Sequence, residues 1–502
     1  MSSTTFTRMT ADEAAALVPD GATVAFSGFT PSGAAKVVPE ALARKARALH
    51  AKNEPFKIRV LTGASTGKKL DDALAGAEAI SWRAPYQSSK LLREQINKGQ
   101  AEFVDMHLSH LPQAVSYGFF GKIDFAVVEA TDVSGDGRIY LSTSIGAAPT
   151  FLHCAEKIIL ELNHYHSVRL SEMADIAMLN PPPHRACIPI HDPITKIGWP
   201  YMSVDPKKIV GIVDNSEPDD VAPFDPPDDC SKRIAERVVR FLLDERKAGR
   251  IPKEFLPLQA GVGNIANAVM AGLGAHPDVP NFMMYTEVFQ DSLVDLTMEG
   301  KILAASATSL TVTPGQLQKI YDNMDFFVPR IVLRPQELSN HPEVIRRLGV
   351  VGMNTAIEVD IYGHANSTHV SGTHLMNGIG GSGDFTRNSY LSVFMCPATA
   401  KGGRISTIVP MATHVDHNEH SVQVVVTDQG LADLRGLGPT DRAHKIINNC
   451  AHPAYRDYLN NYLKRAKTGH ICHDLTTCFE LHQNLAEQGA MLPGVKVDGC
   501  GK

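Results

Sequence analysis

Glu287 raises the first chemical question in this sequence. It ends a short apolar run in the segment MYTEVFQDSLVDL (284–296), and no Lys or Arg stands within several residues to pair with it. An unpaired carboxylate is strongly disfavoured in apolar surroundings, so such an acid either faces a cleft at a strand end or has a raised pKa. Glu287 could therefore act as a nucleophile, a general base or a structural acid that holds a loop or a helix start.

Two glycine-containing turns could present backbone N–H groups to a ligand. In LPLQAGVGNIANAVMAGL (256–273) a Gly-x-Gly turn separates a short apolar stretch from an Ala-rich helix. It lacks the third glycine of the dinucleotide fingerprint and the Gly-Lys-Ser/Thr of a nucleoside triphosphate loop, so an ordinary tight turn is an equal alternative. NGIGGSGDF (377–385) holds four glycines within six residues. Its small side-chain mass favours a close approach to something bound over a merely flexible connection.

Two other polar segments have both a structural and a functional interpretation. ATAKGGRIS (398–406) sets Lys401 and Arg404 around two glycines, as in a solvated turn or in a site for a terminal phosphate. ATHVDHNEHSV (412–422) concentrates three histidines and an aspartate, but no helical register puts all four on one face. These four are His414, Asp416, His417 and His420. We expect imidazoles paired with acids there rather than a metal site, and the lack of a Gly-x-Ser-x-Gly elbow argues against a hydrolase triad.

Short apolar runs alternate with helical patterns along the chain, which predicts an α/β protein with mostly parallel sheets. SEPDDVAPFDPPDD (216–229) interrupts this rhythm, and we interpret it as a linker before a helix that begins near Ser231, whose hydroxyl can cap the first turn. We therefore predict one domain over residues 1–220 and another over residues 230–502. The predicted strands of the first domain are 22–29, 57–63, 124–131, 157–163 and 208–215.

The two halves of the chain share segments in the same order. SIGAAPTF (144–151) is similar to GIGGSGDF (378–385), and FSGF (26–29) precedes QAGVG (259–263) by nearly the same interval. An apolar-Glu-apolar strand with a Gly-containing turn also occurs in both halves. Together these pairs predict a duplicated open α/β domain. Ligands of such domains bind at the carboxyl ends of strands, so we expect the active site between the two halves.

Composition limits the classes of function. The chain has 502 residues, 43% of them hydrophobic and 20% charged, with a formal net charge of -6. These values are typical of a globular protein and give no general attraction to nucleic acid or anionic membranes. The eight cysteines include no Cys-x-x-Cys pair, which gives little support to a disulfide framework or a zinc ribbon. With no signal-peptide pattern and no apolar run of about 18 residues, we expect a cytoplasmic protein.

Six motifs, taken together, point to a known family. They are YTEVFQDSLVDL (285–296), QAGVGN (259–264), NGIGGSGDF (377–385), SNHPEVIRRLG (339–349), HVDHNEH (414–420) and VTDQGLADLRG (426–436). With them the chain resembles the acetyl-CoA hydrolase/transferase family of class I coenzyme A transferases, and within it the bacterial succinyl-CoA:acetate CoA-transferases. The resemblance runs over essentially the whole chain and is more specific in the second half.

The resemblance implies that Glu287 is the nucleophile. It would attack the acyl-CoA carbonyl to give an acyl-glutamyl anhydride and free CoA thiolate, which then attacks the Glu287 carbonyl and leaves a glutamyl-CoA thioester. A second carboxylate reverses these steps to collect CoA. The family places oxyanion donors on the two glycine loops, here at Ile265 and Gly381. It also has an active-site amide, here Asn340, that binds substrate or orients Glu287.

The resemblance further implies a set of residues that contact coenzyme A. Lys401 suits a phosphate group of CoA. One motif departs from the family pattern, because Asp428 stands where the family commonly has Glu, and this puts the role of that position in doubt. The implied contacts are Gln259, Ala260, Gly261, Val262, Gly263, Ile357, Asn377, Gly381 and Lys401.

The function implied by the resemblance is that of an acyl-CoA:carboxylate CoA-transferase, with succinyl-CoA and acetate as the expected pair. CoA and acyl-CoA are then substrates, short-chain carboxylates such as acetate and succinate are the other partners, and no prosthetic group or metal is expected. We expect a homodimer that binds neither nucleic acid nor membrane. Two alternatives stay open: an acetyl-CoA hydrolase, and a catalytically silent protein that binds CoA or a sugar phosphate.

Overall fold

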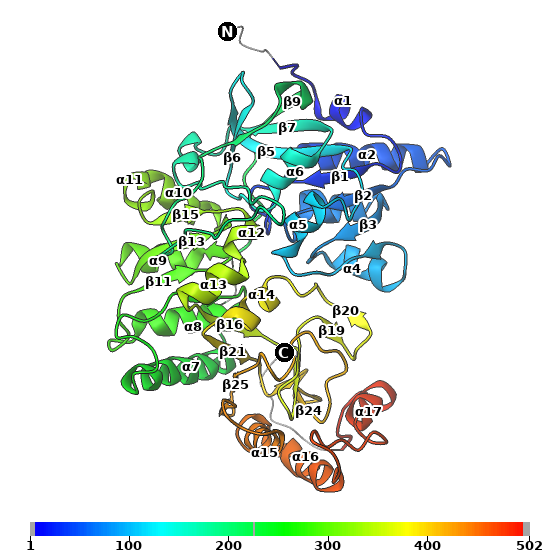
Figure 1. Cartoon of the computed structure of the whole chain (residues 1–502). Helices are drawn as coiled ribbons and strands as arrows, with labels where there is room; N and C mark the ends of the chain where they lie inside the picture. The colour runs from blue at the N-terminus through cyan, green and yellow to red at the C-terminus, as the bar shows by residue number, and fades with distance from the viewer. Residues whose placement is uncertain (1–5, 224–225, 495–502) are drawn as a thin grey trace. The chain divides into compact units, whose positions relative to one another are not determined.

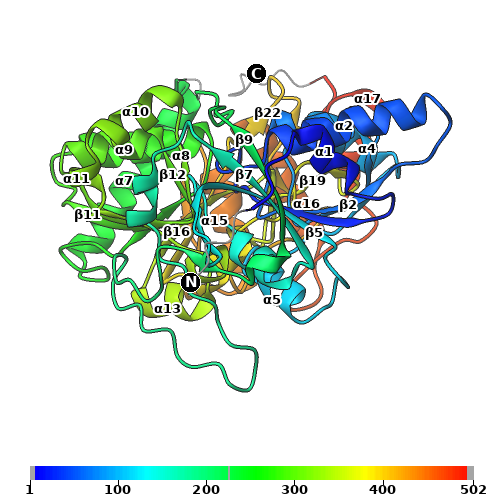
Figure 2. The same cartoon turned by 90° about the horizontal axis from the view of Figure 1, so that it is seen from above.

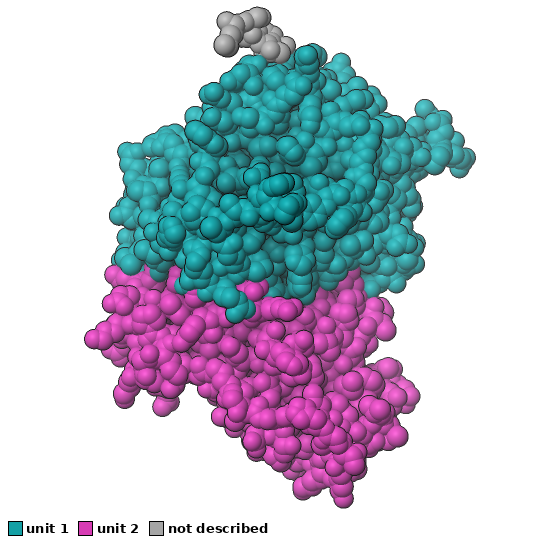
Figure 3. All heavy atoms as spheres, viewed as in Figure 1, with its two compact units in different colours: residues 1–223, 283–348, 377–384 teal, residues 224–282, 349–376, 385–502 magenta. Residues whose placement is uncertain are grey.

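The computed structural model of the chain describes residues 6–223 and 226–494 (Figure 1). Contacts group the chain into two compact units, coloured separately in Figure 3. Unit 1 comprises residues 1–223, 283–348 and 377–384, and unit 2 comprises residues 224–282, 349–376 and 385–502. The first border falls within the predicted linker. The chain then returns twice to unit 1, so the compact units do not follow a single cut in the sequence.

Among the described residues, unit 1 contains a nine-stranded sheet that is mostly parallel. Its strands run in the order β4-β3-β2-β1-β5-β6-β8, and β7 pairs with β5 and β9. The β5–β6 and β6–β8 pairs are antiparallel and the other pairs are parallel. The strands are β1 (Thr23–Phe26), β2 (Ile58–Leu61), β3 (Ile80–Ala84), β4 (Glu102–Phe103), β5 (Phe125–Val133), β6 (Arg138–Leu141), β7 (Lys157–Asn163), β8 (Met202–Ser203) and β9 (Ile209–Asn215).

Helices cover this sheet and share one hydrophobic core with it. α2 (Val37–His50) buries Val38, Leu42 and several alanines in the same cluster as Phe26 of β1 and Val60 of β2. α1 (Ala11–Ala16), which starts at a Thr10–Glu13 capping box, lies beside α2 (Figure 2). The other helical segments of this region are η1 (Lys68–Asp72), α3 (Ala73–Ala75), α4 (Lys90–Asn97), α5 (His110–Ser116), α6 (Ala148–Cys154), η2 (Val168–Glu172) and η3 (Pro206–Lys208).

The second region of unit 1 carries the Glu287 segment. Strands β15, β13 and β11 are neighbours in that order, and β12 pairs with β14 in a small parallel sheet. The strands are β11 (Phe282–Tyr285), β12 (Val288–Gln290), β13 (Ile302–Ala307), β14 (Ser309–Thr311) and β15 (Ile331–Leu333). The helices are α9 (Asp291–Met298), α10 (Pro314–Asp322), α11 (Met324–Phe327), α12 (Gln336–Ser339) and α13 (Pro342–Leu348).

Unit 2 contains the strands β10-β16-β21-β25-β26 in that order, all parallel except for the β25–β26 pair. They are β10 (Leu258–Ala260), β16 (Val351–Thr355), β21 (Leu391–Met395), β25 (Val424–Val426) and β26 (Leu431–Asp433). The smaller strands are β17 (Glu358–Asp360), β18 (Ala365–Asn366), β19 (His369–Val370), β20 (His374–Leu375), β22 (Thr399–Ala400), β23 (Ile405–Ser406) and β24 (Ile408–Val409). The helices are α7 (Asp229–Lys247), α8 (Asn264–Ala275), α14 (Ser382–Asn388), α15 (Pro439–Cys450), α16 (Pro453–Arg465) and α17 (Glu480–Gln488). The first three residues of α14 belong to unit 1 and the rest of it to unit 2.

The predicted α/β class with mostly parallel sheets is confirmed. All five strands predicted for the N-terminal part are present, as β1, β2, β5, β7 and β9. The helix predicted to begin near Ser231 is present as α7, which begins at Asp229. The predicted cap is wrong, because the Asp228 carboxylate accepts the N–H of Ser231 at 2.8 Å. A carboxylate three residues earlier therefore takes the capping role given to the serine hydroxyl. Among the described helices, none has the length and hydropathy that a membrane span requires.

Candidate active site

Glu287 lies in the short connection between β11 and β12 of unit 1. The N–H of the preceding Thr286 donates to the Ser306 carbonyl at 3.0 Å. The Glu287 carbonyl accepts N–H groups from Thr308 at 2.8 Å and Ser309 at 3.3 Å. The main chain is therefore held on both sides by the segment that follows β13, while the side chain projects from the strand end and is partly buried.

Asn340, which follows α12, donates its side-chain amide to Glu287 Oε1. Asn340 is fully buried, and its amide oxygen accepts the hydroxyl of Ser339 at 2.7 Å. The serine hydroxyl thus determines which end of the amide faces the acid. The structure places the predicted nucleophile and the predicted active-site amide in direct contact.

A second carboxylate lies on the other side of this amide. Asn340 Nδ2 is 3.3 Å from Asp384 Oδ2, and Asp384 is 3% exposed. Ser109 donates its main-chain N–H to Asp384 Oδ2 at 3.0 Å and its hydroxyl to Oδ1 at 2.6 Å. We refer to Glu287, Asn340, Asp384 and Ser109 as the Glu287 cluster.

Both acids of the Glu287 cluster have raised pKa values. Burial raises the pKa of Glu287 to about 7, the Asn340 hydrogen bond lowers it in part, and the charge of Asp384 raises it further. Burial also raises the pKa of Asp384 to about 7, against the lowering effect of its hydrogen bonds from Ser109 and Asn340. Val288 adds to the apolar surroundings, because it packs with Phe29, Ala64 and Leu108. Glu287 is therefore an acid whose ionised form is weakly stabilised.

The glycine-rich loop 377–384 belongs to unit 1, and its glycines permit close contacts there. A Cβ at Gly381 would overlap Glu287 Oε1, so the main chain at this position lies directly against the carboxylate. A Cβ at Gly383 would overlap the ring of His107. At Gly378, which has φ of 133°, it would be 2.9 Å from Asp105 Oδ1. Replacing any of these glycines would displace a side chain or the loop.

Asn377, at the start of the same loop, is held by the N-terminal region of unit 1. Its carbonyl accepts the N–H of Gln87 at 3.3 Å, and its side-chain oxygen accepts Arg93 at 2.8 Å. Tyr86 also interacts with Asn377, and burial raises the pKa of its hydroxyl to about 12. Ile379 donates its N–H to both oxygens of Asp105, at 2.9 and 3.0 Å.

Sequence reasoning missed Tyr86, Arg93, Asp105 and Ser109, which contact the loop from positions far away in the chain. No local pattern marks them. Asp384 stands within the motif NGIGGSGDF, before its last residue Phe385, and the predictions for that motif concerned its glycines and not this carboxylate.

The predicted CoA contacts at Gln259 to Gly263 belong to unit 2. Gln259 in β10 is buried and its side-chain oxygen accepts the N–H of Met353 at 3.0 Å. Gly261 donates its N–H to the Met353 carbonyl at 3.2 Å, and Val262 is 45% exposed. Gly263 has φ of 121° and directly precedes α8, of which Ile265 is the second residue. The Gly-x-Gly turn is thus a sharp strand-to-helix connection with an exposed tip.

The remaining predicted contacts also lie in unit 2. Ile357 donates its N–H to the Asn366 carbonyl at 2.7 Å. Lys401 is exposed and lies in the turn between β22 and β23 with φ of 50°, in the left-handed region. Asp428 is buried and accepts the N–H of Ala398 at 2.6 Å, just before β22. Asp428 therefore supports the base of the hairpin that presents Lys401.

In the histidine-rich segment 412–422 of unit 2, His414 and His420 lie beside the acids Asp416 and Glu419, and His364 lies beside Glu419 of the same segment. His364 contacts Asp360 at 2.8 Å through one ring nitrogen and Glu419 at 2.6 Å through the other. His414 lies 3.2 Å from Asp416, whose carboxylate also accepts the N–H of Ser367 at 2.6 Å. These contacts connect the 412–422 segment to the region around β18.

Within the described residues, one group has the geometry to hold a metal ion: Glu129, His166 and Asp219, all buried in unit 1. The ammonium of Lys36 already contacts Glu129, and it lies 3.0 Å from Asp219. Glu161 lies on β7, the strand beside the β5 strand that carries Glu129, and it accepts the Lys36 main-chain N–H at 2.8 Å. We name these five residues the Lys36 cluster. A lysine supplies the positive charge there, so we assign no metal to it.

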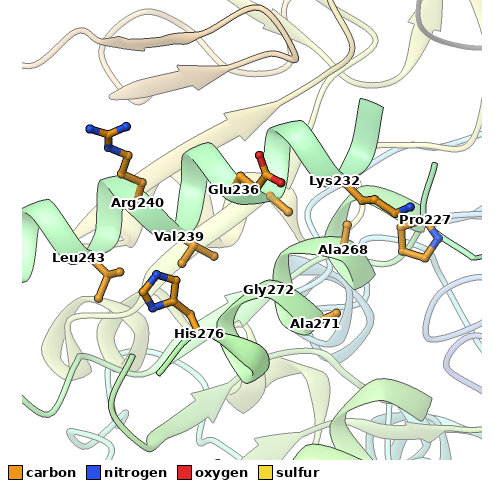
Figure 4. Close-up of a pocket in the computed structure, with 11 residues that line it drawn as sticks. Pro227, Lys232, Glu236, Val239, Arg240, Leu243, Ala268, Ala271, Gly272 and His276 are labelled. Atoms are coloured by element: carbon orange, nitrogen blue, oxygen red, sulfur yellow. The ribbon is translucent and has the colours of Figure 1, made fainter. Parts of the chain in front are cut away.

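A groove on unit 2 runs between α7 and α8 (Figure 4). Its volume is about 760 Å³, and its walls are largely apolar. Val239 and Leu243 of α7 and Ala268 and Gly272 of α8 are among the residues that line it. None of the predicted site residues lines it.

Two family descriptions match the chain. The acetyl-CoA hydrolase/transferase N-terminal domain matches residues 2–214, and the C-terminal domain of the same family matches residues 317–463. A propanoyl-CoA:succinate CoA transferase of Escherichia coli is 57% identical over 489 residues, covering 97% of this chain and 99% of the relative. A succinyl-CoA:acetate CoA-transferase of Clostridium kluyveri is 45% identical over 486 residues, covering 96% and 90%.

Other relatives carry a different name. An acetyl-CoA hydrolase of Candida glabrata is 43% identical over 500 residues, covering 96% of this chain and 94% of the relative. Among solved structures, a 4-hydroxybutyrate CoA-transferase from Porphyromonas gingivalis has a TM-score of 0.62 at 22% identity, covering 91% of this chain and 97% of that structure, which supports the fold. The expected family and an enzyme of the CoA-transferase class are confirmed. The chain belongs to the acetyl-CoA hydrolase/transferase family.

Proposed function

We propose that this protein is an acyl-CoA:carboxylate CoA-transferase that works in ping-pong through a glutamyl-CoA thioester on Glu287. The observation that carries the proposal is the environment of the Glu287 carboxylate. It has a neutral amide as its hydrogen-bond partner, and the main chain of Gly381 lies against it. A carboxylate without a tight ion pair keeps its electron pairs available for attack on a thioester.

The proposed reaction has two covalent steps, which a second carboxylate then reverses. The Glu287 carboxylate attacks the acyl-CoA carbonyl, the C–S bond breaks, and CoA leaves as a thiolate. The thiolate then attacks the Glu287 carbonyl and releases the original acyl group as a carboxylate. The incoming carboxylate reverses both steps. Because the thioester energy is retained on Glu287, the enzyme needs no other energy source.

The oxyanions formed in these steps require hydrogen-bond donors. We assign this role to the main-chain N–H groups at Gly381 and at Ile265, and the contact between Gly381 and Glu287 supports the first. Removing one such donor typically costs about 3 kcal/mol of transition-state stabilisation. Asn340 orients the carboxylate. The Gly-x-Gly turn at 261–263, Ile357, Asn377 and the exposed Lys401 then contact coenzyme A.

For the substrates we propose succinyl-CoA and acetate, with propanoyl-CoA as a second donor. Succinate or its thioester occurs in the names of both transferase relatives, while the partner acid differs between them. The buried apolar group of Phe29, Ala64, Leu108 and Val288 beside Glu287 favours the acetyl or propanoyl chain over the charged end of a succinyl group. A panel of acceptors, with acetate, propanoate and succinate offered to each acyl-CoA, would rank them. Equal rates with every acid would contradict a selective acyl pocket.

The alternative is acetyl-CoA hydrolysis, the activity in the name of the yeast relative. Both activities can share the same nucleophile, and the difference lies in whether water reaches the intermediate. We expect the consumption of succinyl-CoA to depend on added acetate, with acetyl-CoA and succinate formed in equal amounts and no net release of free CoA. Full-rate CoA release without any acceptor acid would favour the hydrolase and overturn the transferase.

A catalytically silent CoA- or sugar-phosphate-binding protein would show no covalent chemistry. We expect borohydride reduction after incubation with acyl-CoA to modify Glu287, as detected by peptide mass spectrometry. An unmodified Glu287 peptide in protein that binds acyl-CoA would support the silent binder. We also propose a homodimer in the cytoplasm, and sedimentation of the purified chain would test the assembly.

A further inference from the structure

Asp384 is the acid of the Glu287 cluster to which the proposed reaction gives no step. Its carboxyl group is buried, and Ser109 holds it through two hydrogen bonds, one from the main chain and one from the hydroxyl. Ser109 itself is fully buried directly before α5. The acid therefore has a fixed orientation, set by a segment that is remote in sequence.

The side-chain amide of Asn340 uses both of its N–H bonds within this cluster. One points to Glu287 Oε1 and the other to Asp384 Oδ2, 3.3 Å from the nitrogen. The amide oxygen accepts the hydroxyl of Ser339. Because an amide group is planar, anchoring its oxygen and one hydrogen fixes the direction of the second hydrogen.

We propose that Asp384 is a positioning residue for CoA transfer: by accepting one N–H of Asn340, it aims the other N–H at the nucleophile Glu287. This inference rests on the proposed function, because it assigns Asp384 a role in the reaction of Glu287. Asp384 touches neither the acyl group nor the reacting carbon and acts through Asn340. Positioning errors of about 1 Å can cost roughly a hundredfold in rate.

The charge of Asp384 has a separate effect on the same site. A second carboxylate close to Glu287 opposes its ionisation and raises the pKa of Glu287. Tyr86 also interacts with Glu287, but its hydroxyl, with a pKa of about 12, stays neutral in the working range. His107 packs on Gly383, beside Asp384, and Asp105 holds Ile379. The titrations of Glu287 and Asp384 are therefore expected to be coupled.

Two variants of Asp384 separate the acceptor from the charge. Asp384→Asn keeps an oxygen for Asn340 and removes the charge, so we expect a modest change in kcat and an acid limb of kcat/KM at lower pH than in the wild type. Asp384→Ala removes the acceptor, and we expect kcat to fall about 10- to 100-fold with little change in KM. A wild-type acid limb in Asp384→Asn, with wild-type kcat in Asp384→Ala, would overturn the proposal.

A double-mutant cycle tests whether Asp384 acts through Asn340. We expect Asn340→Ala alone to lower kcat about 100- to 1000-fold, and Asp384→Ala to cost little more in that background. Asp105→Ala is the matched control, because it removes another acid that holds the 377–384 loop, through the N–H of Ile379 and not through Asn340. Its effect should be the same in both backgrounds. An undiminished cost of Asp384→Ala in the Asn340→Ala background would refute a role through Asn340.

The experiment also distinguishes this inference from the proposed function. If the wild-type chain transfers CoA and the Asp384 variants fail these expectations, the inference alone is wrong. If the wild-type chain transfers no CoA to any short-chain acid, the proposed function fails first. Circular dichroism and thermal unfolding of each variant would show that the fold is retained. Should Asp384→Ala not fold, Asp384→Asn still provides the pH readout.

Discussion

Unit 1 contains two groups of buried acids that differ in their hydrogen-bonding neighbours: one has cationic partners, and the other has a neutral amide. In the Lys36 cluster the ammonium of Lys36 contacts Glu129 and Asp219, and its pKa is raised because these charges outweigh the effect of burial. The pKa of Asp219 is lowered, because Lys36 and His166 overcome the effect of burial. In the Glu287 cluster the atom between the two acids is a neutral amide nitrogen, and both pKa values rise to about 7.

Under the proposed mechanism, this difference separates a structural group from a reactive one. In the Lys36 cluster Glu129 and Asp219 have cationic partners in Lys36 and His166, and these contacts hold α2 and the strands around it. The Glu287 carboxylate is left poorly stabilised in the resting protein, and attack on a thioester relieves its charge. Burial of an acid is common to both places, and it is the nature of the neighbour that distinguishes them.

The largest effect is expected from removing the reactive acid. Glu287→Gln keeps the shape and removes the nucleophile, so we expect CoA transfer to fall roughly 10⁴-fold or more while the fold is retained. Steady-state assays with succinyl-CoA and acetate measure this. Glu299→Gln, at an exposed acid after α9, is the control and should keep full activity. Substantial transfer by Glu287→Ala would remove Glu287 from the mechanism.

Removing the lysine of the Lys36 cluster should lower the stability of the fold. Lys36→Met leaves Glu129 and Asp219 buried without the lysine and with His166 as a remaining cationic neighbour. Breaking a buried ion pair costs about 3–5 kcal/mol of unfolding free energy. Chemical denaturation at neutral pH would show a lower midpoint. Lys45→Met, which removes a half-buried lysine that donates only to the carbonyls of Ala15 and Val18, should cost about 1 kcal/mol or less. Equal midpoints for the two variants would mean that the Lys36 cluster is not held by its charges.

The pH dependence of kcat/KM should reveal the raised pKa values of the Glu287 cluster. Glu287 must be ionised to attack, and its pKa of about 7 means that kcat/KM should fall below neutral pH, approaching tenfold per unit. Because Asp384 titrates in the same range, the observed midpoint belongs to the pair. Rates measured from about pH 5 to about pH 9 would test this. A flat profile down to pH 5 would show that Glu287 is as acidic as an exposed glutamate.

The smallest effect concerns stability at the reactive acid. The pKa of Glu287 is raised from 4.5 to about 7 in the folded chain, so its contribution to stability is lost as the pH rises through 7. Glu287→Gln cannot ionise and should be more stable than the wild type by about 1–2 kcal/mol near pH 8. Near pH 5 the difference should shrink. Denaturation midpoints at both pH values give the comparison, and a destabilised Glu287→Gln at pH 8 would contradict it.

Much of the fold could be predicted from sequence because local patterns determine it. The apolar runs at 22–29 and 124–131 became β1 and β5, since a buried parallel strand needs little beyond such a run. Glu287 is conspicuous in the sequence because it ends another apolar run, in the segment 284–296, without a basic neighbour. Its role as nucleophile and that of Asn340 came from the family resemblance, because no local pattern distinguishes a reactive acid or amide from a structural one.

The partners of these residues could not be predicted, because they depend on which strands become neighbours. Ser109 lies far along the chain from Asp384, and the segment around it carries no sign of a hydrogen bond to a distant acid. Asp384, in the first turn of α14, has the ordinary appearance of an acid at a helix start. Lys36 has the appearance of a surface lysine, and only the fold brings Glu129 and Asp219 to it.

The chain passes from one compact unit to the other five times, at residues 223/224, 282/283, 348/349, 376/377 and 384/385. Ser109 stands before the first passage, whereas Glu287, Asn340 and Asp384 all follow it. A gene divided at the linker would therefore yield one fragment with the anchor and another with the acids and the amide. We therefore expect neither fragment to transfer CoA alone, and activity to return only when both fragments are combined.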